Sequence, residues 1–238
     1  MDNHQSEVKQ AKVVEDPRLS LTQFSRYHGS TLKGRQRILL DSKYPGDYIP
    51  KYYNIARKII TGTFSANFND YDLYFEEFRR QATILKKEAL AFPSNTDDYK
   101  NRYLSAGALE ALIRMADKLT RVLDRYVLNT NSKRAAIMVN GVKISSKADM
   151  QLFDLAAEQI GLLRFNFSQS RLKTNEADLA LKVLMSYAKE TDGKSLAPKH
   201  CLLIDIHSGN ILTAKDNRLI ESVLLDSCSE IGQIWKAL

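Results

Sequence analysis

The spacing of hydrophobic residues changes along the chain. From Leu19 to Asn129 apolar residues recur every three or four positions, as in helices that bury one face. Between Arg134 and Ser168 the spacing falls to two, which is typical of strands. The predicted order of elements is helices, three strands, a helix, a strand and a final helix.

The first half is predicted to be helical. Proline, glycine and capping residues divide it into four segments: Leu19–Tyr27, Gly34–Asp41, Lys51–Thr61 after Pro50, and a helix capped by Asp70 or Asp72 that continues to about Leu90. The longest helix is expected from about Leu104 to Asn129, where Leu109, Leu112 and Leu119 belong to one apolar stripe.

The middle of the chain is predicted to form strands. Asn140-Gly141 is a strong hairpin signal, and it separates two short strands, Ile137–Val139 and Val142–Ser146. Met150–Phe153 extends the second strand or forms the next one. Ile160–Phe167 is a clear strand, with Leu163, Phe165 and Phe167 on one face.

The later elements are a helix capped by Asn175, a strand at Cys201–Ile206 and a helix from about Arg218 to Leu238. Together these elements predict an α+β protein in which a small mixed β-sheet is flanked by helices. Three parts are expected: a flexible tail (1–17), a basic helical region (18–95) and an α+β domain (100–238).

The composition of the chain indicates the kind of partner more than it indicates the fold. The 238-residue chain has a formal net charge of +7, which suits a polyanion such as DNA or RNA. Cys201 and Cys228 lie in no C-x-x-C pair, so buried free thiols in a reducing compartment are expected. The N-terminus resembles no signal peptide and no apolar run is long enough to span a bilayer, so we expect a cytoplasmic protein without membrane contact.

Positive charge is concentrated between residues 26 and 58. Only Asp41 and Asp47 oppose eight basic residues there, and tyrosines are interleaved with them. Such a pattern favours phosphate contact and stacking on bases. Alternatively, the tyrosines form a helical core with the lysines as its solvated rim. The candidate nucleic-acid-binding residues are Arg26, Lys33, Arg35, Arg37, Lys43, Lys51, Tyr52, Arg57 and Lys58.

The order of helix, three strands, helix and strand, with the isolated acid Asp149, resembles the restriction-endonuclease-like PD-(D/E)xK superfamily. The resemblance covers roughly residues 104–206. It implies that Asp149 is the acid of the second strand, that Glu110 is the helical acid, and that the acids hold Mg²⁺ for phosphodiester cleavage. In Lys147-Ala148-Asp149, alanine stands where the family often has proline.

The third strand departs from the family pattern. In the family this strand supplies an acid and, two residues later, a lysine, but Gly161–Asn166 contains no acid. If Arg164 replaces the family lysine, Leu162 stands at the acid position. If Arg164 stands at the acid position, Asn166 replaces the lysine. Some members of the family have a glutamine four residues before a tyrosine on the next helix. Here Tyr187 matches the tyrosine, but Val183 stands at the position of the glutamine. The site residues implied are Asp149, Arg164 and Glu110, with Asp149 as the metal ligand.

Each candidate also has a structural interpretation. Glu110 can pair with Arg114 on a solvated helix face, and Asp149 can be a turn residue that Arg164 neutralises without any metal. Asp154 or Glu158 could supply a displaced carboxylate. Asp205 and His207 share one strand face, where a solvated pair at a hairpin edge is favoured over a metal site.

Three functions follow from these residues. The first is a nucleic-acid-binding protein on a nuclease-like core whose metal site is incomplete. The second is a Mg²⁺-dependent endonuclease that uses Asp149 with Asp154 or Glu158. The third is a non-enzymatic subunit whose final helix, with Trp235, docks a protein partner. The chain contains no P-loop, zinc-protease or G-x-S-x-G motif, which disfavours those enzyme classes.

Overall fold

The computed structural model describes residues 13–46, 52–131 and 136–238. Its elements are β1 (Arg18–Leu19), α1 (Leu21–Gly29), α2 (Leu32–Lys43), α3 (Asn54–Phe64), α4 (Asp72–Ala89), α5 (Asp97–Ile113), α6 (Ala116–Leu123), β2 (Val127–Thr130), β3 (Ala136–Val139), β4 (Val142–Ser145), β5 (Met150–Phe153), β6 (Gln159–Asn166), α7 (Thr174–Thr191), the 3₁₀ helix η1 (Pro198–His200), β7 (Cys201–Asp205), β8 (Asn210–Thr213) and α8 (Arg218–Ala237). Among the described helices, none is long and apolar enough to cross a membrane.

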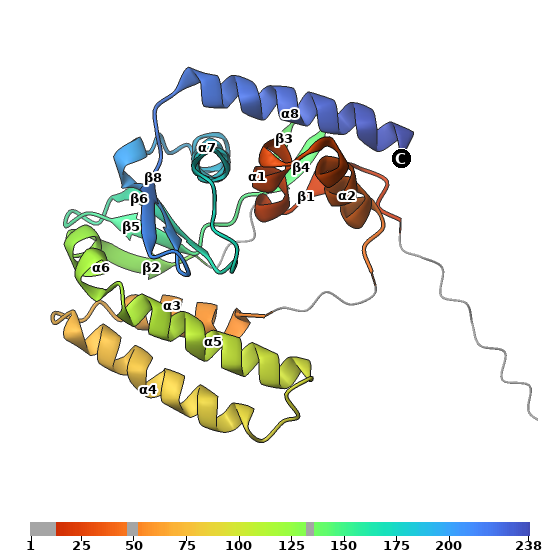
Figure 1. The fold of residues 1–238 in the computed structure, drawn as a ribbon. Coiled ribbons are helices and arrows are strands. Elements are labelled where there is room, and N and C mark those ends of the chain that lie inside the picture. Colours follow the sequence, from red (N-terminus) through yellow and green to blue (C-terminus); the bar gives the residue numbers. More distant parts are fainter. Residues whose placement is uncertain (1–12, 47–51, 132–135) are drawn as a thin grey trace, which may run out of the picture.

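The predicted α+β class is confirmed, and the strands form two sheets. The larger sheet has the order β2-β5-β6-β7-β8, and the smaller one has the order β1-β4-β3. In the larger sheet β6 and β7 are parallel, and the other neighbours are antiparallel. Figure 1 shows this sheet between α7 and α8 on one side and the α3, α4 and α5 layer on the other.

Both faces of the larger sheet are buried, because successive side chains of a strand point to opposite faces. Leu162 of β6 packs with the apolar residues of α1, α2, α7 and α8. Leu163 and Phe165 pack with those of α3 to α6. Phe167 joins the same side, as the alternation of Leu163, Phe165 and Phe167 predicted. A sheet covered on both faces exposes its polar groups chiefly at the strand ends.

Local signals were reliable where neighbouring residues determine the conformation. Asn140 and Gly141 both have positive φ, 46° and 79°, as a two-residue hairpin between β3 and β4 requires. Ser20 caps α1 in a capping box with Gln23. The sequence did not predict that this hairpin pairs with β1 in a sheet of its own, because that pairing depends on residues far apart in the chain.

The prediction of one helix from Leu104 to Asn129 is wrong. The structure has α5, an interruption at Met115 (φ −98°, ψ 5°) and then α6. Val127–Thr130 forms β2, where Leu128 pairs with Leu152 of β5. The apolar stripe continues into β2 because Leu128 is buried by the sheet, so hydrophobic spacing alone did not reveal the change of element.

The predicted division into a basic helical region and an α+β domain stays a prediction, and the described contacts cross it. Phe24 and Tyr27 of α1 share one apolar core with Leu184 of α7 and Trp235 of α8. Of the predicted tail, residues 1–12 lie outside the described part of the chain. Val14 is buried, and the carbonyl of Glu15 accepts a hydrogen bond from the Trp235 indole at 2.8 Å.

The two cysteines should be unreactive in the native protein. Cys201 and Cys228 are free and buried, as predicted, and burial raises the pKa of each thiol to about 12. Because the thiolate is the reactive form, we expect negligible reaction with a disulfide reagent at pH 8 and reaction of both thiols after unfolding in urea. Rapid labelling of the native protein would contradict this burial.

Gly161 should tolerate no larger side chain. A Cβ added there would lie 2.1 Å from the carbonyl oxygen of His200, so the backbones of β6 and η1 would have to separate. We expect Gly161→Ala to lower the free energy of unfolding by about 1–3 kcal/mol, the usual cost of overpacking. Gly107→Ala on α5 is the control: open space surrounds it, and alanine favours helix. Equal urea midpoints for both variants would refute this close approach.

Candidate functional site

The candidate site lies at one end of the larger sheet. Because β5 is antiparallel to β6 and β6 is parallel to β7, the start of β5 meets the ends of β6 and β7. Asp149 precedes β5, Arg164 and Asn166 are near the end of β6, and Asp205 ends β7. The carboxyl ends of neighbouring parallel strands are a common place for ligand sites in open sheets.

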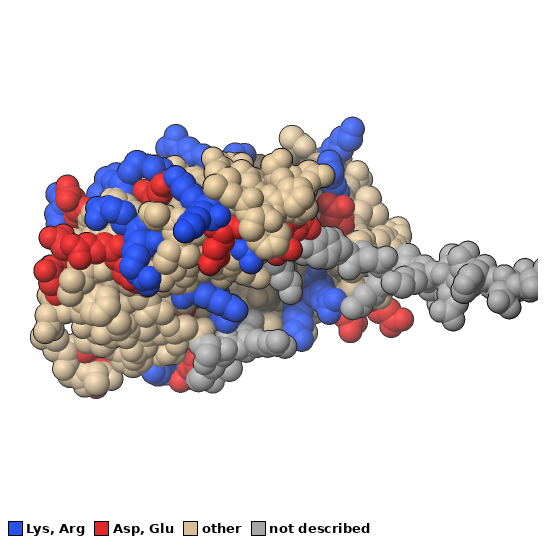
Figure 2. All heavy atoms as spheres, turned by 90° about the horizontal axis from the view of Figure 1, so that it is seen from below, with Lys and Arg blue, Asp and Glu red and all other residues tan. Residues whose placement is uncertain are grey.

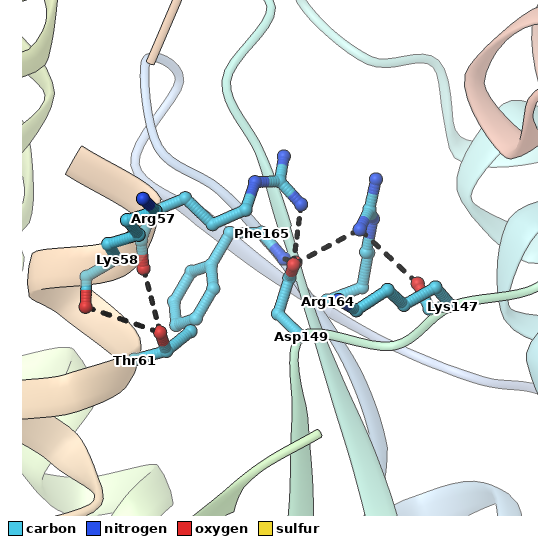
Figure 3. A network of polar contacts seen from close by, with 7 residues as sticks. All are labelled: Arg57, Lys58, Thr61, Lys147, Asp149, Arg164 and Phe165. Carbon is cyan, nitrogen blue, oxygen red and sulfur yellow. Dashed lines mark hydrogen bonds and ion pairs between the residues drawn. The ribbon is translucent and has the colours of Figure 1, made fainter. Parts of the chain in front are cut away.

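The buried carboxylate of Asp149 is the centre of the site. Its side chain is only 2% exposed. Oδ1 accepts hydrogen bonds from Nη1 of Arg57 on α3 and, at 3.1 Å, from Nη1 of Arg164 (Figure 3). Oδ2 accepts a bond of 2.8 Å from the backbone N–H of Phe165. Two cations and a backbone donor therefore compensate one buried negative charge.

Arg164 is held in place from two sides. Its Nη1 also donates to the carbonyl oxygen of Lys147 at 3.2 Å. Burial lowers the pKa of the Arg164 guanidinium and the charge of Arg57 lowers it further, while Asp149 opposes the shift. A guanidinium remains protonated in proteins at neutral pH, so the group of Asp149, Arg57 and Arg164 carries a net charge of +1.

The structure separates Glu110 from this group. Its carboxylate pairs with Lys86 of α4 at 2.5 Å, and both side chains are substantially exposed. The expectation that Glu110 faces solvent in an ion pair is met with a different partner, Lys86 rather than Arg114. α4 lies on the outer side of the helical layer (Figure 1). The Glu110 side chain is therefore engaged away from Asp149.

Asp154 and Glu158 lie at the other end of β5. Strands rise about 3.3 Å per residue, so the five steps from Asp149 to Asp154 span ~16 Å. Oδ1 of Asp154 accepts hydrogen bonds from the N–H groups of Ala156 and Glu158, at 3.0 and 2.9 Å, in the β5–β6 turn. Neither acid can share a metal with Asp149. Among the described residues no group of three or more His, Cys, Asp or Glu is placed to hold a metal ion.

Asp205 is a second buried acid at the same end of the sheet. Asn166 donates to its Oδ1 at 2.8 Å, while Ser208 and the N–H of Leu172 donate to Oδ2. The expectation of a solvated Asp205–His207 pair is wrong for Asp205, which is 1% exposed, whereas His207 is exposed. Asp205 thus fixes the loop between β6 and α7 to the end of β7.

The basic residues of the N-terminal region occupy different surroundings. Arg35 forms two bonds of 3.0 Å with Glu230, and Lys43 donates to the Trp235 carbonyl. The Tyr52 hydroxyl donates to Asp97 at 2.7 Å. Exposed positions are taken by Lys33, Arg37 and Lys58, while Lys51 lies outside the described residues.

Arg26 and Arg57 belong to different helices, and both bond to residues in loops next to the sheet. Nη2 of Arg26 donates to the hydroxyls of Ser168 and Ser170 in the β6–α7 loop. Arg57 reaches Asp149 from α3. Arg57 and Arg164 therefore share Asp149, while Arg26 is held by the loop that follows β6. The predicted basic residues therefore lie partly at this end of the larger sheet and partly on α2.

Sequence analysis did not predict the aromatic contacts beside the site. Tyr53 stacks on Phe167, with ring centroids 5.5 Å apart, and His207 stands edge-on to Tyr53 at 5.8 Å. The guanidinium of Arg57 lies over the Phe167 ring at 4.9 Å. Phe167 was expected on this face of β6, but its contact with Tyr53 joins residues 114 positions apart, which no local pattern indicates.

The final helix does not offer Trp235 to a partner. Trp235 is 2% exposed, and Leu224, Cys228 and Ile231 of α8 are buried with it in the chain's own core. The expectation that this apolar face docks a second protein loses its structural basis, because the face is already covered.

No protein-family model matches the chain, and no curated protein matches it either. Around the site the order is a helix (α6), three antiparallel strands (β2, β5 and β6), a helix (α7) and a parallel strand (β7). The β3–β4 hairpin is inserted between the first two of these strands.

Removing the charge of Asp149 should destabilise the protein. Asp149→Asn keeps an oxygen for the Phe165 N–H but leaves two guanidinium groups uncompensated, so we expect a loss of about 3–5 kcal/mol in unfolding free energy. Adding Arg164→Met should recover part of that loss, because one of the two cations is removed. Urea denaturation of the single and double variants measures both effects.

Glu110→Gln is the matched control for this change of charge. Its exposed pair with Lys86 should contribute at most about 1 kcal/mol. An Asp149→Asn variant as stable as Glu110→Gln would show that the buried ion group does not stabilise the fold.

Proposed function

We propose that this protein binds nucleic acid on a core similar to that of the restriction endonucleases, without the metal site that cleavage requires. The observation that carries the proposal is the commitment of Asp149 to Arg57, Arg164 and the Phe165 N–H. A carboxylate in that state has no free charge to offer Mg²⁺, and the two guanidinium groups beside it repel a cation.

The positions of these residues support the alignment that places Arg164 where the superfamily has an acid. Asp149 directly precedes the second of the three antiparallel strands, and Arg164 lies near the end of the third. Asn166, at the lysine position, bonds to Asp205. In this alignment a guanidinium fixed by Asp149 takes the place of the metal as the positive charge that faces a phosphate.

The orientation of the two guanidinium groups supports phosphate binding. Within the described residues, the side-chain hydrogen bonds of Arg57 and Arg164 all come from Nη1. Figure 3 shows both guanidinium groups on one side of Asp149, with their other terminal nitrogens pointing away from the carboxylate. Paired N–H groups of arginine match the oxygens of a phosphate in charge and geometry.

The charge of the whole molecule favours the same partner. A net charge of +7 attracts a polyanion over a distance of several ångströms and raises the rate of encounter. Figure 2 shows basic and acidic side chains mixed over one face, with Lys and Arg side chains flanking a hollow near its middle. Binding would therefore depend on a local group of cations more than on a uniformly basic face.

The two other functions have less support. A displaced carboxylate from Asp154 or Glu158 would have to act from the far end of β5. A docking role for α8 would require its buried apolar face to separate from the core. Nucleic-acid binding needs no such rearrangement.

The proposal predicts salt-dependent binding that involves Arg57. In a fluorescence anisotropy titration with labelled DNA and RNA, we expect log affinity to fall linearly with log salt concentration. Arg57→Gln should weaken binding and reduce the slope by about one, the loss of one phosphate contact. Arg164 still pairs with Asp149 in this variant, and circular dichroism would verify that it folds.

Arg79→Gln is the control, because Arg79 is an exposed arginine on α4 and its loss changes the net charge equally. EDTA should leave the affinity unchanged, since no metal bridges the phosphate. Undetectable binding at low salt, or equal effects of Arg57→Gln and Arg79→Gln, would overturn the proposal.

A further inference from the structure

An aromatic cluster, formed by Tyr53, Phe167 and His207, adjoins the arginine pair. Phe167 is 6% exposed and forms its floor, Tyr53 stacks on it, and His207 is exposed at the edge of Tyr53. Arg57 connects the two features, since its guanidinium lies over Phe167 while its Nη1 reaches Asp149. Guanidinium groups and aromatic rings are therefore neighbours.

The backbone at Tyr53 is held in an unfavourable conformation. Its φ of 69° and ψ of 6° belong to the left-handed region, which costs a non-glycine residue about 1–2 kcal/mol. The conformation turns the chain into α3, where the Tyr53 carbonyl accepts the bond from Arg57 N–H at 2.9 Å. One residue thus sets both the ring of Tyr53 and the start of the helix that carries Arg57. Strain of this kind is concentrated at functional sites.

We propose that this end of the sheet binds a single-stranded segment, with a phosphate on Arg57 and Arg164 and the adjacent base against His207 and Tyr53. The inference rests on the proposed function and specifies its ligand. Proteins that bind single strands combine basic groups for the backbone with aromatic rings on which bases stack.

The arrangement discriminates against a duplex. In a double helix the base faces are stacked on each other, and exposing one costs a few kcal/mol. In a single strand the base faces are available to an exposed ring without that cost. His207 lies in the turn between β7 and β8, where a ring can meet a base without any change in the sheet. Duplex binding would use the arginines and leave the aromatic cluster without a partner.

The test compares labelled single strands of about 12 nucleotides, oligo(dT) and oligo(U), with a duplex of the same length. We expect the single strands to bind the full chain at least tenfold more tightly. His207→Ala should weaken single-strand binding about 5- to 100-fold and leave duplex binding unchanged. His207→Phe should restore the affinity, because a ring without charge still stacks.

Tyr44→Ala is the control, since Tyr44 is an exposed ring whose hydroxyl donates to the carbonyl of Leu238, the residue after α8. Equal affinity for single strand and duplex, with no effect of His207→Ala, would overturn this inference and leave the proposed function standing. A weakened His207→Phe variant would overturn the stacking role. Failure of every probe to bind wild-type protein would overturn both proposals.

Discussion

The structure around the site depends on compensating the buried charge of Asp149. An isolated carboxylate at this depth would cost several kcal/mol, so its partners must be present for the fold to be stable. One partner comes from the same sheet, Arg164, and the other from α3, Arg57. The ion group thus fixes the end of the sheet and the helix beneath it in one arrangement. The ion group also has an excess positive charge, because two cations surround one anion.

Strand direction explains why so many polar groups meet at this place. The antiparallel turn from β5 to β6 and the parallel crossover from β6 to β7 bring Asp149, Asn166 and Asp205 to the same end of the larger sheet. Both faces of the sheet are apolar, so polar side chains can be held at this end of the strands without being surrounded by hydrocarbon groups. Asp205 accepts hydrogen bonds from neutral donors, whereas two guanidinium groups compensate the charge of Asp149. The two acids therefore contribute differently: Asp205 positions a loop, and Asp149 positions arginines.

Sequence patterns predicted what neighbouring residues decide. The Asn140-Gly141 turn and the alternation in β6 follow from local preferences. The pairing of Arg164 with Asp149 could also be expected from the sequence, because the two residues belong to neighbouring strands. Arg57 is 92 positions from Asp149, and nothing near either residue indicates that pair. The end of the helix before β2 was missed because a buried leucine satisfies a helical stripe and a strand equally well.

In the proposed function, replacing a metal by a guanidinium pair changes what the site can do with a phosphodiester. A bound Mg²⁺ neutralises charge and also activates a water molecule for attack. Arginine donates hydrogen bonds in a fixed plane and activates no water, so it can hold a phosphate without supplying a nucleophile. Interactions that are equal in the bound and transition states give affinity and no catalysis. A core of this kind would keep the recognition of nucleic acid and lose cleavage, and affinity would depend on the position of Arg57 and Arg164 that Asp149 maintains.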